Sequence, residues 1–134
     1  MERRNSGITV AHREGMTEIM RSTNFEMLRE HCPELAELGG FAEQYAGPDP
    51  SSALVKLRAF IESMVSRIYT AYGVPRPWQP SLNDLLNNQA FTALIPPVVL
   101  DKFHAIRIHG NKAAHGEQQN TQKALWLLKE AYDL

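Results

Sequence analysis

The feature that most constrains this chain is a long apolar stripe at helical spacing between residues 50 and 72. An α-helix places residues three and four positions apart on one face, so such a stripe predicts a helix that other elements must cover. At 3.6 residues per turn, the predicted helix has about six turns. The stripe comprises Leu54, Leu57, Ile61, Met64, Val65, Ile68 and Tyr72, while Lys56, Glu62 and Arg67 lie off it.

Residues at both ends of the stripe set the limits of this central helix. Residues 47–50 read Gly-Pro-Asp-Pro, in which Asp49 suits the N-cap and Pro50 the first helical position. Gly73 can end the helix because glycine adopts the left-handed conformation of a C-terminal cap. The following segment, residues 74–80, contains three prolines and predicts an extended connection.

Shorter helical patterns precede the central helix. We expect Asn24 to cap a short helix whose Phe25, Leu28 and Met27 face inward. Pro33 suits the first turn of a second helix that ends at about residue 45. Its apolar positions are Leu35, Leu38, Phe41 and Tyr45.

Three more helices are predicted after the central one. Ser81 with Asp84 forms a capping-box pattern, and the prolines at 96 and 97 open the next helix. Gly110 predicts a kink in that helix, and Thr121 is placed to cap the last one. The apolar positions of these helices are Leu82, Leu85 and Leu86, then Leu100, Phe103 and Ile106, and finally Ala124, Leu125, Leu128, Ala131 and Tyr132.

These patterns predict an all-α fold, a single bundle of about five to six helices, because no alternating strand pattern of four or more residues competes with them. A length of 134 residues suits one domain. We expect residues 1–23 to form a flexible leader or a loosely docked segment and residues 24–134 to form the bundle. The last helix runs to the final residue without a cap, so we expect the chain to be a fragment of a larger protein.

Composition narrows the classes of function. The formal charge of −1 gives the whole chain no attraction to polyanions, so any nucleic-acid site must be a local patch. Cys32 is the sole cysteine, which excludes an internal disulfide and a thiolate zinc cluster. Without a signal peptide or an apolar run long enough for a membrane span, a cytoplasmic location and no membrane partner are expected. The sequence has no P-loop, Rossmann glycine pattern or nucleophile elbow, and we expect no cofactor.

The local patch lies at residues 102–115. This segment contains Lys102, Arg107 and Lys112 together with His104, His109 and His115, and no acidic residue lies between Asp101 and Glu117. Histidine is the side chain that titrates near neutral pH, so proton transfer is possible there. The three histidines do not share one helical face and no nearby acid completes a ligand set, so no metal site is expected.

An ordered series of motifs carries a family resemblance. It consists of residues 24–28, residues 33–40, Asp49-Pro50 followed by residues 53–58, and Ile106-Arg107 with Gly-Asn-Lys-Ala-Ala-His-Gly at residues 110–116. Over about residues 20–134 the chain resembles the N-terminal domain of R (HsdR-type) subunits of type I restriction enzymes. That resemblance implies partners within a restriction-modification complex, with ATP-driven translocation and DNA cleavage located elsewhere in the larger polypeptide.

Such domains are similar in turn to the HEPN superfamily of helical proteins. Active members carry an Arg followed four to six residues later by a His, and cleave RNA without metal across a dimer interface. Asn111 and His115 match the polar and His positions of this motif, whereas Gly110 stands where the Arg is expected. Arg107 is the candidate substitute, since it lies one helical turn before Gly110.

Other roles for the same residues remain open. His115 can interact with free carbonyls at a helix C-terminus, and Asn111 can cap a helix that restarts after Gly110. Arg107 can form an ion pair with Glu62 or Asp101. Trp78 and Trp126 can stack on bases or anchor loops.

Three functions therefore compete. The first is a non-catalytic accessory domain that makes protein contacts or senses nucleic acid through Lys102, Arg107, Asn111, Lys112 and His115. The second is a metal-independent ribonuclease that acts as a homodimer, with His115 and Arg107 as catalytic residues. The third is a simple dimerisation module. Convergence of Arg107, Asn111 and His115 on one open surface favours a nucleic-acid site, and burial of Arg107 against a carboxylate favours a scaffold.

The central helix provides a first test. Replacing Ile61 by Ala should lower the free energy of unfolding by about 2–5 kcal/mol, the usual loss when a large aliphatic side chain is deleted from a core. Urea denaturation measures this loss. A change below about 0.5 kcal/mol, typical of surface positions, would show that this face is exposed.

Overall fold

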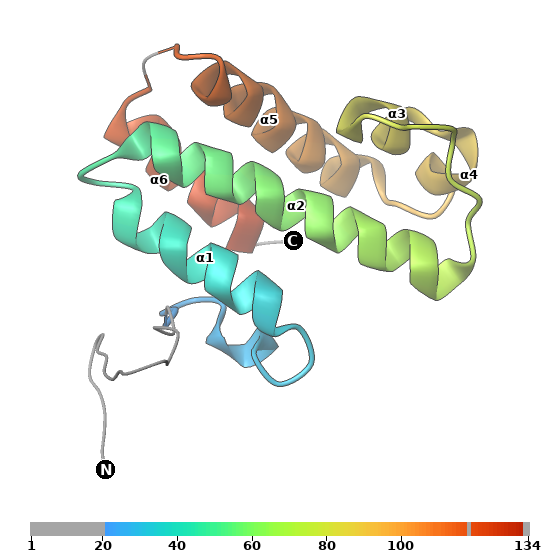
Figure 1. The fold of residues 1–134 in the computed structure, drawn as a ribbon, viewed down its shortest axis with the longest axis horizontal. Coiled ribbons are helices and arrows are strands. Elements are labelled where there is room, and N and C mark those ends of the chain that lie inside the picture. The colour runs from blue at the N-terminus through green and yellow to red at the C-terminus, as the bar shows by residue number, and fades with distance from the viewer. Residues whose placement is uncertain (1–20, 118, 133–134) are drawn as a thin grey trace.

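The computed structural model describes residues 21–117 and 119–132 and has six α-helices and one short 3-10 helix in those residues, with no strand (Figure 1). The order is η1 (Glu26–Leu28), α1 (Pro33–Tyr45), α2 (Pro50–Tyr72), α3 (Leu82–Asn87), α4 (Gln89–Thr92), α5 (Pro97–Ala114) and α6 (Thr121–Tyr132). The predicted all-α class is confirmed. The predicted leader comprises residues 1–23, and the described part of the chain begins only at residue 21. The leader therefore stays a prediction.

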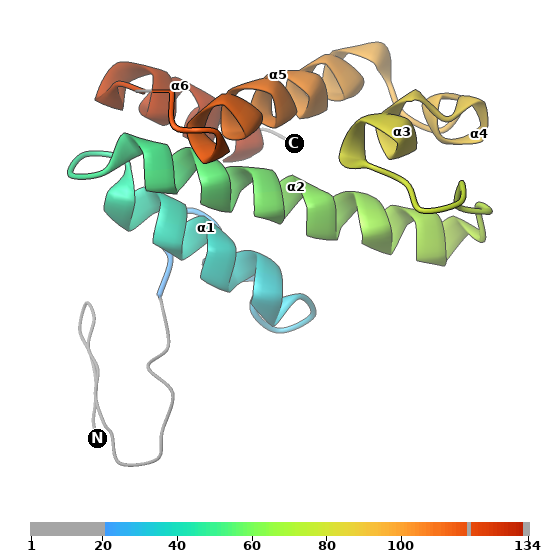
Figure 2. The same ribbon diagram turned by 45° about the horizontal axis from the view of Figure 1, so that its top comes forward.

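Helix α2 lies at the centre and packs against α1, α5 and α6, with α3 near its C-terminal half (Figures 1 and 2). Its predicted limits are confirmed. The Asp49 carboxylate accepts a hydrogen bond from the Ser52 N–H at 3.2 Å, and Gly73 is left-handed with φ of 63°. These caps satisfy backbone groups that would otherwise lack partners at the two helix ends.

The buried surface of α2 is wider than the predicted stripe. Leu54, Leu57, Ile61 and Val65 are fully buried as expected, but Met64 and Ile68 are only half-buried and Tyr72 is exposed. The fully buried Phe60 and Tyr69 were not predicted. The reason is that α2 has partners on several sides, so no single stripe describes its apolar surface.

Aromatic contacts fill these further sides of α2. The Phe60 ring lies 5.0 Å from the ring of Phe25, and the Tyr69 ring stacks 5.1 Å from that of Phe91. The Tyr69 hydroxyl donates to the Leu85 carbonyl at 2.5 Å, which satisfies a polar atom inside the core. Phe91 belongs to α4, a short helix that the sequence analysis did not predict.

Two predicted caps are wrong by a residue or more. The 3-10 helix η1 follows Phe25, and the Asn24 side chain does not cap it. At α6 the Asn120 side chain accepts from the Lys123 N–H at 2.7 Å, whereas the Thr121 hydroxyl donates to the Gly47 carbonyl at 3.1 Å. At η1 no side chain caps the helix, and the Asn24 N–H donates to Glu43 of α1. At α6 two neighbouring polar residues suit the cap, and the contact of Thr121 with Gly47 leaves that role to Asn120.

Inward-facing residues near the two ends also differ from the predictions. Phe25 is buried, but Met27 is exposed. In α6 the unpredicted Leu127 is buried, and Leu125 and Tyr132 are about half exposed. The neighbouring elements cover a somewhat different face of α6 from the one that spacing alone indicated.

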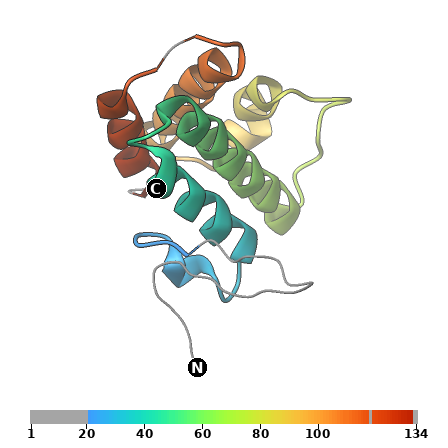
Figure 3. The same cartoon turned by 60° about the vertical axis from the view of Figure 1, so that its left-hand side comes forward.

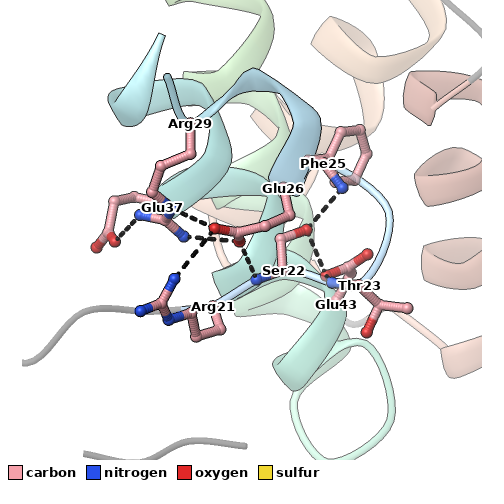
Figure 4. A network of polar contacts seen from close by, with 8 residues as sticks. All are labelled: Arg21, Ser22, Thr23, Phe25, Glu26, Arg29, Glu37 and Glu43. Carbon is pink, nitrogen blue, oxygen red and sulfur yellow. Dashed lines mark hydrogen bonds and ion pairs between the residues drawn. The ribbon is translucent and has the colours of Figure 1, made fainter. Parts of the chain in front are cut away.

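The segment before α1 is held by buried and polar contacts, and it lies below α1 in Figure 3. Glu43 of α1 accepts hydrogen bonds from the Ser22 hydroxyl at 2.7 Å and from the Thr23 N–H at 2.8 Å (Figure 4). It also accepts one from the Asn24 N–H at 2.7 Å. Phe25, in the same segment, packs closely on Gly39 of α1. A methyl group on residue 39 would overlap the Phe25 ring. Glycine at position 39 therefore allows the segment to dock.

An ion pair completes the network. The Glu26 carboxylate accepts from the Arg29 Nε at 2.6 Å, and Arg29 also reaches Glu37 at 2.8 Å (Figure 4). The hydrogen bond from Arg29, together with the Ser22 N–H and the nearby positive charges, lowers the pKa of Glu26 from 4.5 to about 2, against the opposing effect of burial.

This shift predicts a specific pH dependence of stability. Because the pKa of Glu26 is lower in the folded chain than in the unfolded chain, its contribution is complete above about pH 4.5 and is lost as the pH falls toward about 2. Urea denaturation across this range should show a smaller loss of stability for Glu26→Gln than for the wild type. Glu30→Gln, at an exposed carboxylate of the same segment, is the control and should retain the wild-type profile. Identical profiles for Glu26→Gln and wild type would contradict the assignment.

Candidate nucleic-acid interface

Gly110 does not kink the helix that carries the basic segment. Helix α5 runs without interruption from Pro97 to Ala114, so the predicted kink is wrong. Gly110 is buried where α5 meets α2, and a Cβ atom there would lie 2.6 Å from the Arg58 Cβ and 3.1 Å from the Leu54 carbonyl oxygen. The glycine is explained by the close approach of two helices.

A continuous α5 places Arg107, Asn111 and His115 at successive intervals of four residues, and hence along one flank of the helix. The Asn111 side chain accepts a hydrogen bond from the Arg58 Nε at 2.6 Å, so its predicted alternative role as an N-cap is wrong. His115 is the exposed C-cap residue of α5, at the helix end that the alternative role required, but its side chain makes no hydrogen bond to a carbonyl within the described residues.

Arg58 is the residue of this surface that the sequence analysis missed. Its stem crosses Gly110, its Nε binds Asn111, and its Nη1 lies 3.4 Å from the Glu62 carboxylate, while about 29% of the side chain stays exposed. The available signal was a glycine inside a strongly helical pattern, which marks a site of close packing. The sequence alone did not show which residue of α2 would lie across it.

Arg107 contacts a histidine in place of the predicted carboxylate. Its Nε donates to the His104 Nδ1 at 3.3 Å, and Glu62 pairs with Arg58 instead. Burial and the charge of Arg107 lower the pKa of His104, partly opposed by Asp101. A neutral imidazole can accept this hydrogen bond, whereas a protonated one cannot.

The structure divides the five residues predicted to bind nucleic acid. Arg107, Asn111 and His115 lie along one flank of α5, and Asn111 contacts Arg58 of α2 there. We call this surface, together with Arg58 and His104, the α2–α5 flank. Lys102 lies on the side facing α6, half-buried and 3.5 Å from the Glu130 carboxylate. Lys112 is exposed in the last turn of α5.

The other candidates lie elsewhere. His109 meets Trp126 of α6, and Trp78 is 72% exposed, so Trp78 does not anchor its loop. Among residues 21–117 and 119–132, no three His, Cys, Asp or Glu side chains are grouped closely enough to hold a metal ion. No helix in the same residues is long and apolar enough to cross a membrane.

Comparison with known proteins shows the family to which the chain belongs. Residues 41–133, which include α2 and all of α5, match the family described as Domain of unknown function (DUF4145), and the chain belongs to that family. Among individual proteins, it is 27% identical over 116 residues to the type I restriction enzyme EcoKI endonuclease subunit of Escherichia coli (strain K12). That match covers 87% of this chain but only 10% of the restriction subunit. No solved structure matches the chain significantly.

The close contact at Gly110 can be tested by adding one methyl group. Gly110→Ala should lower the free energy of unfolding by a net of about 1–2 kcal/mol, because overpacking outweighs the better helix propensity of alanine. Gly47→Ala is the matched control, since a Cβ at Gly47 would meet nothing within 4 Å and should not destabilise the chain. If Gly110→Ala were as stable as the wild type in urea denaturation, the proposed close approach of α2 and α5 would be wrong.

Proposed function

We propose that this chain is a non-catalytic accessory domain of a type I restriction-modification endonuclease R subunit and contacts nucleic acid through the α2–α5 flank. The similarity to the EcoKI endonuclease subunit over most of this chain supports the setting. In this proposal the partners are the rest of the R subunit, the other subunits of the complex, and the nucleic acid.

The observation that carries the nucleic-acid role is the pair of guanidinium groups on this flank. Arg58 and Arg107 come from two different helices, and each remains partly exposed. Glu62 is the carboxylate paired with Arg58. The two arginines and this one carboxylate together have a net positive charge. Guanidinium groups bind phosphates well because their N–H groups match the spacing of the oxygens.

The arrangement supports binding more strongly than cleavage. Cleavage of a phosphodiester bond requires a proton-transfer group and a fixed cation beside the phosphoryl oxygens. Gly110 supplies no cation, and His115 has no hydrogen-bond partner in the described residues to orient it. A catalytic histidine ordinarily has such a partner.

One specific observation favours the ribonuclease alternative. Arg107, Asn111 and His115 share one flank of a continuous helix, and Arg58 brings a guanidinium group to Asn111 from the neighbouring helix. A dimer of this chain with two such flanks facing each other would bring His115 and Arg107 to an RNA strand in the manner of HEPN ribonucleases.

Binding and cleavage assays with labelled RNA and DNA test both functions. Arg107→Ala should weaken binding and reduce the slope of log affinity against log salt by about 0.7 for a single strand or 0.9 for a duplex, since one phosphate contact is lost. Arg67→Ala removes an exposed arginine from α2 outside this flank and should leave both quantities unchanged. No RNA cleavage is expected.

Two results would contradict the proposal. Equal effects of Arg107→Ala and Arg67→Ala, or no binding at low salt, would remove the nucleic-acid role of the flank. Metal-free cleavage that leaves 2',3'-cyclic phosphate ends, and that is lost in folded His115→Ala and Arg107→Ala, would replace the accessory domain by a ribonuclease.

A further inference from the structure

The side of α5 that faces α6 carries a second polar surface, distinct from the α2–α5 flank (Figure 2). Here His109 of α5 meets Trp126 of α6 edge to face, with ring centroids 6.4 Å apart and planes at 74°. Half of the Trp126 side chain is exposed, although the other side of α6 is buried in the core. An indole held by a neighbouring ring, yet open to solvent, can accept another ring by stacking.

Two lysines lie close to this aromatic pair. Lys112 follows His109 by three residues in α5, and Lys123 precedes Trp126 by three residues in α6, so each lysine lies about one helical turn from a ring of the pair. In agreement with this placement, burial and the charges of Lys123 and Lys112 lower the pKa of His109. Neither lysine forms an ion pair with any residue in the described part of the chain, and Glu130, farther along α6, is bound to Lys102. Within the described residues, the positive charges of these two lysines are therefore not paired with a carboxylate.

One ring nitrogen of His109 forms no hydrogen bond within the described residues. Its Nδ1 is buried and has no partner within the described residues, and the Gln119 Oε1, from the segment between α5 and α6, is in the same state. Both atoms lie out of contact with solvent, so the parts of this corner that a ligand can reach are the exposed Trp126 ring and the two lysines.

We infer that the α5–α6 flank, formed by His109, Lys112, Lys123 and Trp126, binds single-stranded nucleic acid, with a base on the Trp126 indole and phosphates at the two lysines. Aromatic platforms beside cations are how proteins hold single strands without reading their sequence. A duplex fits less well because its bases already stack on one another and expose no face to the indole. An acidic peptide would use the lysines but gain nothing from stacking.

This inference rests on the proposed function for its class of ligand, but it uses different residues, so the two can be tested separately. In a Trp78→Phe background, Trp126 is the remaining tryptophan and its fluorescence reports this flank alone. The probe is an oligothymidylate of about eight nucleotides, within the roughly 4–16 that one binding fold usually covers. Fluorescence anisotropy of the labelled oligonucleotide reports binding anywhere on the protein.

Saturable quenching of Trp126 is expected at low salt. Replacing both Lys112 and Lys123 by Ala should reduce the salt slope by about 1.4, which is 0.7 for each of two phosphates. Trp126→Ala should weaken binding by about 5- to 150-fold, the usual effect of losing one stacked base. Arg67→Ala is the control cation, and circular dichroism checks that each variant is folded.

Three outcomes would overturn the inference. Anisotropy that shows binding without Trp126 quenching, and that responds to Arg107→Ala alone, would leave the proposed function intact and remove this second site. Displacement by polyglutamate as readily as by oligothymidylate would assign the flank to an acidic peptide. No binding by either readout would remove both proposals.

Discussion

The close contact between α5 and α2 at Gly110 determines how the candidate surface is built. Because position 110 has no side chain, the stem of Arg58 can cross α5 there and its guanidinium can reach Asn111. Helix α5 continues without interruption through this position, so residues four apart along it form one row. A larger residue at this position would separate the two helices and disperse the polar groups that now lie together.

The parts of the structure that could be predicted from the sequence are those that local signals determine. The limits of α1 and α2 and the capping box at Ser81 followed from local signals, namely prolines, caps and helical spacing, and these held. Predictions that needed knowledge of neighbours did not hold, as shown by the exposed Tyr72, the buried Phe60 and the straight helix through Gly110. Local chemistry sets where helices begin and end, whereas the faces they bury depend on partners distant in sequence.

The site was predictable to a similar extent. The sequence identified α5 as the helix of interest and named Arg107, Asn111 and His115, which the structure places on one flank. It grouped with them Lys102, which faces α6, and it omitted Arg58. A guanidinium from another helix leaves no trace in the spacing of α5, and only the packing of the two helices brings it there. Charge in this family member is thus assembled across a helix–helix contact.

In the proposed function, Arg58 and Arg107 form one surface that contacts nucleic acid. Nuclear magnetic resonance of the arginine Nε–H groups can test this role, because each guanidinium reports on its own surroundings. Arg76, which binds the Ser66 carbonyl at the far end of α2, serves as an internal reference. On addition of a short RNA, the signals of Arg58 and Arg107 should shift while that of Arg76 stays in place. Shifts at Arg76 alone, or at none of the three in a solution where the RNA is bound, would show that Arg58 and Arg107 do not contact the RNA.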